Sequence, residues 1–85
     1  MSELLQQYIT NIEDHGVTYV ARSYGEERID GTWTGWLEFY PDDPTMPILR
    51  TGQETSQPNR LTIEYWATGL EPIYLEGALE RAKGH

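Results

Sequence analysis

The side chains best suited to acid–base chemistry or metal binding are scarce in this sequence. It contains two histidines, His15 and the terminal His85, and no cysteine. The missing thiols exclude disulfide bonds, thiol catalysis and cysteine-ligated zinc. Any metal site would need oxygen ligands alone, and the Asp-x-Asp-x-Asp-Gly pattern of a calcium loop does not occur. We therefore expect no metal and no cofactor, and we expect His15 to lie at the end of a helix, near its free carbonyl groups.

Serine and acidic residues could supply a nucleophile or an acid–base pair, but their spacing favours neither. None of Ser2, Ser23 and Ser56 lies in a Gly-x-Ser-x-Gly motif. The carboxylates gather in predicted turns and on predicted helix exteriors, whereas a paired-carboxylate glycosidase holds two of them across a sugar-sized cleft. Glycine-rich phosphate-binding motifs do not occur either. The sequence predicts a non-catalytic protein, with an unrecognised small enzyme as an alternative.

Aromatic side chains are the second group that could form a binding site. On the strands predicted below, four of them fall on faces that are less suited to the core: Tyr24, Trp36, Tyr40 and Trp66. An exposed apolar patch of this kind usually marks an interface. We expect the four residues to form an interaction surface for a protein partner or for a second copy of the chain. Burial of the same residues in a thin core is the plainer alternative.

The same aromatic residues could stack nucleic-acid bases, as they do on several small RNA-binding sheets. Contacts to a nucleic-acid backbone also need Lys and Arg. The chain has 6 Lys+Arg against 14 Asp+Glu, a formal net charge of −8. Only Arg22, Arg50 and Arg60 lie on or beside the predicted strands. Unless these arginines converge beside the aromatic residues, repulsion should prevail, so we expect no nucleic-acid partner.

A polar segment, residues 52–59, has no apolar side chain other than the ring of Pro58. A loop of this kind in a small domain either binds something or is simply mobile. The alternative to a docking surface is therefore a pocket for a small ligand or peptide, with Trp33 or Trp36 as its floor and this loop as its rim. The candidate residues of the loop and its base are Arg50, Gln53, Thr55, Ser56, Asn59 and Arg60.

Hydrophobic periodicity predicts the elements that would position these residues. Residues 2–15 and 72–83 have the apolar spacing of amphipathic helices. Residues 17–24 and 32–40 alternate as strands do, and residues 48–51 are long enough for a short third strand. These elements are separated by polar turns rich in glycine and proline.

Residues 60–68 are ambiguous. Their apolar positions align on one side of a strand but scatter around a helical wheel, so we predict a strand and keep a helix as the alternative. In the second strand, the face of Trp33, Leu37 and Phe39 is the better core candidate. Gly35 shares that face, and it marks either a bulge or a place where a large group such as a Trp ring lies across the backbone.

These elements predict one small domain over residues 1–85. Their order, a helix, four strands and a helix, does not alternate strands with helices. The predicted fold is therefore α+β, a four-stranded antiparallel meander with an N-terminal and a C-terminal helix packed on one face. The sequence has no apolar run as long as a membrane span and no signal-peptide pattern, so we expect a cytoplasmic protein.

Overall fold

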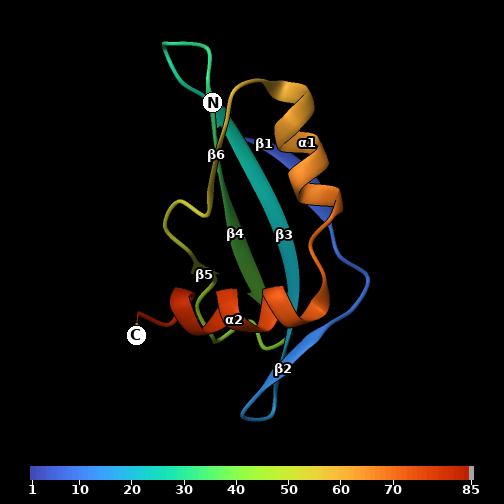
Figure 1. Ribbon diagram of the computed structural model, residues 1–85. Coiled ribbons are helices and arrows are strands. Elements are labelled where there is room, and N and C mark those ends of the chain that lie inside the picture. Colours follow the sequence, from blue (N-terminus) through green and yellow to red (C-terminus); the bar gives the residue numbers. More distant parts are fainter. Residues whose placement is uncertain (85) are drawn as a thin grey trace.

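The computed structural model describes residues 1–84 and shows a small α+β fold (Figure 1). The strands are β1 (Glu3–Gln7), β2 (Ile12–Asp14), β3 (Val17–Glu27), β4 (Trp33–Pro41), β5 (Leu49–Arg50) and β6 (Thr55–Gln57). The helices are α1 (Arg60–Thr68) and α2 (Pro72–Ala82). The predicted α+β class and antiparallel sheet are confirmed. The predicted N-terminal helix is wrong, because both helices follow the last strand.

The long strands β3 and β4 organise the sheet. They pair from Tyr19 opposite Pro41 to Glu27 opposite Trp33. β1 and β2 both pair with the edge of β3 that faces away from β4. β5 and β6 both pair with the edge of β4 that faces away from β3. The two long predicted strands are confirmed with slightly shifted ends, and the predicted third strand is confirmed as the shorter β5. Within residues 1–84 the sheet has six strands rather than four, because β1, β2 and β6 are added and the strand predicted over residues 60–68 is a helix.

The prediction of a helix over residues 2–15 is wrong because this segment forms β1 and β2. A bulge between Leu4 and Gln6 shifts the pairing of β1 with β3. An extra residue in a strand breaks the two-residue alternation by which a strand is recognised in a sequence. Tyr8 and Ile12 are both buried and lie four residues apart. This spacing resembles that of a helix, although Tyr8 follows β1 and Ile12 begins β2.

The prediction of a strand over residues 60–68 is also wrong, and the helical alternative is confirmed as α1. Ile63 and Ala67 are the buried residues of this helix, and they lie one helical turn apart. Leu61 and Tyr65 remain 76% and 82% exposed. The strand prediction treated these two residues as part of the buried face. A buried stripe this narrow gives little helical periodicity, because half of the large apolar residues face solvent.

Both helices pack on one face of the sheet, which we call the helix face (Figure 1). α1 contacts β1, β3, β4 and β6, and α2 contacts β2, β4 and β5. Trp33, Leu37 and Phe39 are buried on this face, so the predicted core face of β4 is confirmed. A Cβ atom at Gly35 would lie 2.8 Å from Cζ3 of Trp66. The prediction that a Trp ring lies across the backbone at Gly35 is therefore confirmed.

A buried tyrosine connects the end of α1 to the sheet. The hydroxyl of Tyr8 donates a hydrogen bond to the backbone carbonyl of Ala67 at 2.6 Å, and it is hydrogen bonded to Oγ of Ser23 at 3.0 Å. The carbonyl of Ala67 lies in the last turn of α1, where carbonyl groups lack partners within the helix. Burial raises the pKa of Tyr8, so its hydroxyl keeps the proton that it donates.

Glu54 connects the segment before β6 to α2. Its carboxylate accepts hydrogen bonds from the Tyr74 hydroxyl at 2.6 Å and from Nε and Nη2 of Arg81 at 3.0 and 2.6 Å. The side chain of Glu54 is only 8% exposed. Burial alone would raise its pKa, but the hydrogen bonds from Arg81 and Tyr74 outweigh burial and hold the pKa of Glu54 below its usual range.

The remaining predictions concern the C-terminal helix, the shape and the location of the protein. The predicted helix over residues 72–83 is confirmed as α2, which is one residue shorter. The molecule is elongated, with principal extents of 41 × 21 × 21 Å. Neither helix within residues 1–84 is long and apolar enough to cross a membrane. The single domain over residues 1–85 and the cytoplasmic location stay predictions.

Candidate functional site

The sheet face opposite the helices carries an ordered array of side chains. Residues paired directly on neighbouring strands project to the same face, so the register places Tyr24 beside Trp36 and Val20 beside Tyr40. In the row between them, Glu38 is paired with an arginine on each neighbouring strand. We call this surface the open face and define it by seven residues: Leu4, Arg22, Tyr24, Trp36, Glu38, Tyr40 and Arg50.

Three of the four predicted interaction residues meet on the open face. The rings of Tyr24 and Trp36 stack with their centroids 6.2 Å apart and an interplanar angle of 16°. The hydroxyl groups of Tyr24 and Tyr40 are hydrogen bonded at 2.9 Å. The carboxylate of Glu38 accepts hydrogen bonds from Nε1 of Trp36 at 2.9 Å and from the hydroxyl of Tyr40 at 2.5 Å. Both oxygens of this carboxylate are therefore bound to aromatic donors.

The hydroxyl of Tyr40 is held in its protonated form. Burial, followed by the hydrogen bonds to Glu38 and Tyr24, raises the pKa of Tyr40. Tyr24 and Tyr40 are half-buried, and Trp36 is only 5% exposed. The aromatic cluster is thus a fixed layer of the sheet surface, with its donors directed at Glu38 rather than at solvent.

Two arginines cover the rings of this cluster. The guanidinium carbon of Arg50 lies 4.3 Å from the ring centroid of Trp36, and that of Arg22 lies 4.4 Å from the ring centroid of Tyr40. A cation over an aromatic face is attracted by the electrons of the ring. Nε of Arg22 also donates a hydrogen bond to the side chain of Gln7 at 2.8 Å. The outermost layer over the aromatic cluster is therefore made partly of guanidinium groups.

A third arginine reaches the same face from the connection between β3 and β4. Nη1 of Arg28 donates to Oγ of Ser56 at 2.8 Å, and Nη2 donates to the side chain of Gln53 at 2.6 Å. Ser56 is paired directly with Thr34, which is on the same side of β4 as Trp36. Arg28 therefore holds two of the predicted pocket-rim residues against the open face.

Trp66 does not join the other three aromatic residues. It belongs to α1, and its ring lies against Gly35 on the helix face. Its expected place beside Tyr24, Trp36 and Tyr40 followed from the strand predicted for residues 60–68, and it is corrected together with that strand. The sheet itself separates Trp66 from the open face.

The residues predicted to rim a ligand pocket divide over three places. Arg50 lies on the open face, and Gln53 and Ser56 are bound by Arg28. Thr55 begins β6 and accepts a hydrogen bond from the side chain of Gln57 at 2.7 Å. The remaining two, Asn59 and Arg60, lie at the start of α1 on the helix side.

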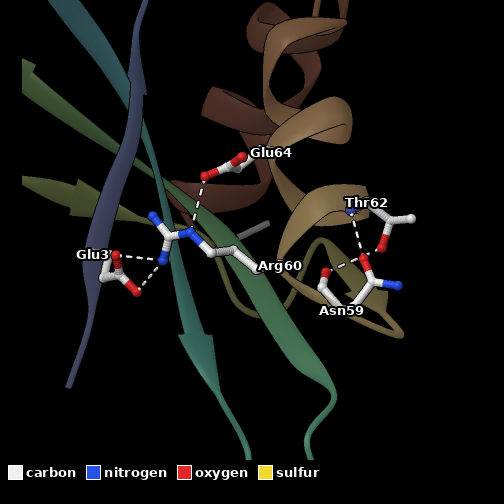
Figure 2. A network of polar contacts seen from close by, with 5 residues as sticks. All are labelled: Glu3, Asn59, Arg60, Thr62 and Glu64. Carbon is white, nitrogen blue, oxygen red and sulfur yellow. Dashed lines mark hydrogen bonds and ion pairs between the residues drawn. The ribbon is translucent and has the colours of Figure 1, made fainter.

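Asn59 and Arg60 fix the start of α1 against β1 (Figure 2). The side-chain oxygen of Asn59 accepts a hydrogen bond from the backbone N–H of Thr62 at 2.9 Å, which caps the helix. Nη1 of Arg60 contacts both carboxylate oxygens of Glu3 at 2.6 Å, and Nε of Arg60 donates to Glu64 at 3.0 Å. The cation of Arg60 is therefore shared between two carboxylates.

A cleft opens beside this ion-pair network. It has a volume of about 640 Å³, within the size range of small-ligand pockets. Arg60 lies over the ring of Trp33, with its guanidinium carbon 5.4 Å from the ring centroid. The lining residues are Met1, Glu3, Glu27, Gly31, Trp33, Asn59 and Arg60. The cleft thus combines Trp33 with one end of the segment that the sequence predicted as a rim.

His15 lies in the turn between β2 and β3 rather than at the end of a helix. It has a backbone φ of 50° and precedes Gly16, with a φ of 81°, as in the tight turns that connect hairpin strands. Nδ1 of His15 lies 3.2 Å from the carboxylate of Asp14, which also binds Nζ of Lys83 at 2.9 Å. Within residues 1–84, no group of three or more His, Cys, Asp or Glu side chains could hold a metal ion.

Besides Leu4, whose strand was predicted as a helix, two residues that reach the open face, Glu38 and Arg28, were not identified from the sequence. Glu38 lies two residues from both Trp36 and Tyr40, so strand alternation alone places it beside them. That signal was available. Arg28 lies in a connection and reaches the open face through its long side chain, so no periodicity in the sequence could indicate its place.

The chain matches no protein-family model, no curated protein and no solved structure.

Proposed function

We propose that this protein is a non-catalytic interaction module that docks another protein on its open face. The observation that carries the proposal is the aromatic cluster on the sheet face opposite both helices. Tyr, Trp and Arg are the residue types that most often dominate the binding energy of protein interfaces. The open face brings all three types together: Arg50 covers the ring of the buried Trp36, and the half-buried Tyr40 lies beside them.

The cluster is also organised in advance of binding. Stacking and hydrogen bonds among Tyr24, Trp36, Tyr40 and Glu38 fix these side chains. A partner would therefore lose little affinity to ordering them. Leu4, paired directly with Tyr24, is 53% exposed and adds an apolar contact at the edge of the cluster. A fixed surface with an apolar margin suits a protein partner.

A small ligand or peptide in the cleft beside Arg60 is the second candidate function. The observation that favours it is the volume of about 640 Å³ together with a lining of Trp33, Arg60 and two carboxylates, Glu3 and Glu27. Small-ligand sites typically combine an aromatic wall with a few polar groups. Against it, the cation of Arg60 already binds Glu3 and Glu64. We therefore place this candidate after the open face.

Site-specific photo-crosslinking in the cells that produce the protein tests the docking proposal. A photoreactive phenylalanine analogue replaces either Leu4, on the open face, or Leu61, on the solvent side of α1. Both positions are exposed, Leu4 to 53% and Leu61 to 76%, so each has room for the larger side chain. We expect a discrete protein adduct from position 4 and none of the same mass from position 61.

The captured protein is then purified and its affinity measured by calorimetry. We expect Leu4→Asn to weaken binding by about fivefold or more, because an apolar contact is lost. Leu61→Asn is the matched control and should change the affinity by less than about twofold. The reverse pattern, or an adduct from position 61 alone, would move the docking surface to α1.

A further inference from the structure

We infer that the open face selects an acidic segment of a different protein, which binds through carboxylates to Arg22 and Arg50. This inference rests on the proposed function and names the partner chemistry of the same surface. It depends on how the six basic side chains are distributed over the two faces of the sheet. It also depends on the hydrogen-bond partners of Glu38, the carboxylate between Arg22 and Arg50.

The basic side chains divide evenly between the two faces of the sheet. Of the 6 Lys+Arg, Arg22, Arg28 and Arg50 reach the open face, and within residues 1–84 none of these three forms an ion pair with a carboxylate. The other three lie on the helix side and each binds at least one carboxylate. They are Arg60, Arg81 and Lys83.

The register places the carboxylate of Glu38 where it could form ion pairs with Arg22 and Arg50. Arg22, Glu38 and Arg50 form one row across β3, β4 and β5, and opposite charges in such a row usually pair. Here the carboxylate of Glu38 is bound to Trp36 and Tyr40 instead. The two arginines lie over aromatic rings, which attract a cation without using its N–H donors.

The row also defines the spacing of the two cations. Neighbouring strands are about 4.8 Å apart, so the backbones of Arg22 and Arg50 are separated by roughly 10 Å across β4. A guanidinium group binds a carboxylate through two parallel hydrogen bonds. Nε of Arg22 is engaged by Gln7, and within residues 1–84 no carboxylate forms an ion pair with this guanidinium group. An extended acidic segment could place one carboxylate at each arginine.

Charge complementarity favours this partner over a second copy of the chain. In a symmetric dimer formed by the open face, the same patch meets itself. The centre of one patch, with Arg22 and Arg50, would then face the same centre of the other copy, and like charges at an interface are costly. Glu38 offsets only one of these two positive charges in each copy, because its hydrogen bonds from Trp36 and Tyr40 leave its own charge unchanged.

The burial of the rings also favours a protein over a single-stranded nucleic acid. Of the three arginines on or beside the predicted strands, Arg22 and Arg50 do converge beside the aromatic residues. Base stacking, however, needs an open ring face. Trp36 is 5% exposed and lies under Arg50, and the whole chain carries a net charge of −8. Nucleic acid therefore enters the test as the competing outcome.

A matched pair of peptides tests the inference on the intact protein. The probe is a capped peptide of alternating Glu and Thr, and its control has Gln in place of every Glu. In an extended peptide, alternate residues face the same side, so all the carboxylates can face the sheet. Affinity is measured from the NMR shifts of the Nε–H groups of Arg22 and Arg50. We expect the Glu peptide to bind about tenfold or more tightly than the Gln peptide.

The variant Arg50→Gln should weaken binding of the Glu peptide by about fivefold or more. Arg60→Gln removes the same charge from the helix side and should change the affinity by less than about twofold. Equal binding of the two peptides, or no binding of either, would overturn the inference. Tighter binding of an oligouridylate than of the Glu peptide at the same arginines would overturn it in favour of nucleic acid.

The failures of the two proposals can be told apart. If the peptides do not discriminate but the adduct at position 4 forms, the docking proposal stands and the acidic partner is refuted. If the adduct at position 4 does not form in cells, the docking proposal fails whatever the peptides do. A concentration-dependent dimer that is abolished by Arg50→Glu would identify a second copy as the occupant and contradict the inference.

Discussion

The two faces of this sheet use the same kinds of residue in opposite ways. On the helix face, Tyr8 and Trp66 are fixed against the sheet, the first by hydrogen bonds to Ser23 and Ala67 and the second by contact with Gly35. Polar and aromatic groups there serve to join the helices to the strands. On the open face the aromatic residues hold one another and carry two arginines, and neither helix of residues 1–84 packs over them.

The difference separates what stabilises the fold from what is available for binding. Cations on the helix side each bind a carboxylate, as Arg81 binds Glu54. Those on the open face bind aromatic rings or neutral side chains. A substitution on the helix face should therefore change stability. A substitution of an open-face arginine should change binding and lower the free energy of unfolding only by the lost attraction to the ring, about 0.5–1 kcal/mol.

The largest expected effect on stability is that of Gly35→Ala on the helix face. The added Cβ would meet Cζ3 of Trp66 at 2.8 Å and Cγ2 of Thr55 at 2.9 Å. Overpacking of this kind costs about 1–3 kcal/mol in the free energy of unfolding, which urea titration measures. Gly52→Ala is the control, because nothing lies within 4 Å of its Cβ position. Equal stabilities for the two variants would contradict the packing of α1 on β4.

Removing one hydroxyl from each face gives the next effect. Tyr8→Phe leaves the carbonyl of Ala67 and the hydroxyl of Ser23 without their buried partner, which should cost about 1–2 kcal/mol. Tyr24→Phe removes a hydrogen bond to Tyr40, whose hydroxyl still binds Glu38, and should cost about 0.5 kcal/mol. Thermal unfolding followed by circular dichroism compares the two. A larger loss for Tyr24→Phe would reverse the roles assigned to the faces.

A smaller, pH-dependent effect is expected at Glu54. Its folded-state pKa is lowered, so the stability that it contributes is present above the unfolded value of about 4.3 and is lost as the pH falls through the folded value. Glu54→Gln should therefore cost about 1 kcal/mol at pH 7, and the deficit should shrink in acid. Glu76→Gln, exposed on α2, is the control. A deficit that grows as the pH falls would contradict this sign.

Much of the central sheet could be predicted from the sequence, whereas its margins could not. Alternation in β3 and β4 is regular because both strands are long and paired throughout. β1 has a bulge after Leu4, and α1 buries only Ile63 and Ala67, so neither has the periodicity of its type. These two errors have local causes, and they fall on the elements that the central strands hold in place.

The open face was predictable to the extent that it depends on strand alternation. Tyr24, Trp36 and Tyr40 share a face because they are paired or alternate on β3 and β4. Trp66 was misplaced because its position followed from the wrong element. The distribution of the cations was not predictable, because Arg28 comes from a connection and the pairing of Glu38 with aromatic donors depends on side-chain geometry.

The most direct test of the account uses the three tryptophans as reporters of three places. Trp36 lies on the open face, Trp33 lines the cleft beside Arg60, and Trp66 packs between α1 and the sheet. The indole N–H signals of the ¹⁵N-labelled protein are followed while the protein captured through position 4 is added. We expect a shift of the signal of Trp36, whose N–H binds Glu38, with the signals of Trp33 and Trp66 unchanged. A shift of Trp33 with Trp36 unchanged would place binding in the cleft and contradict the account.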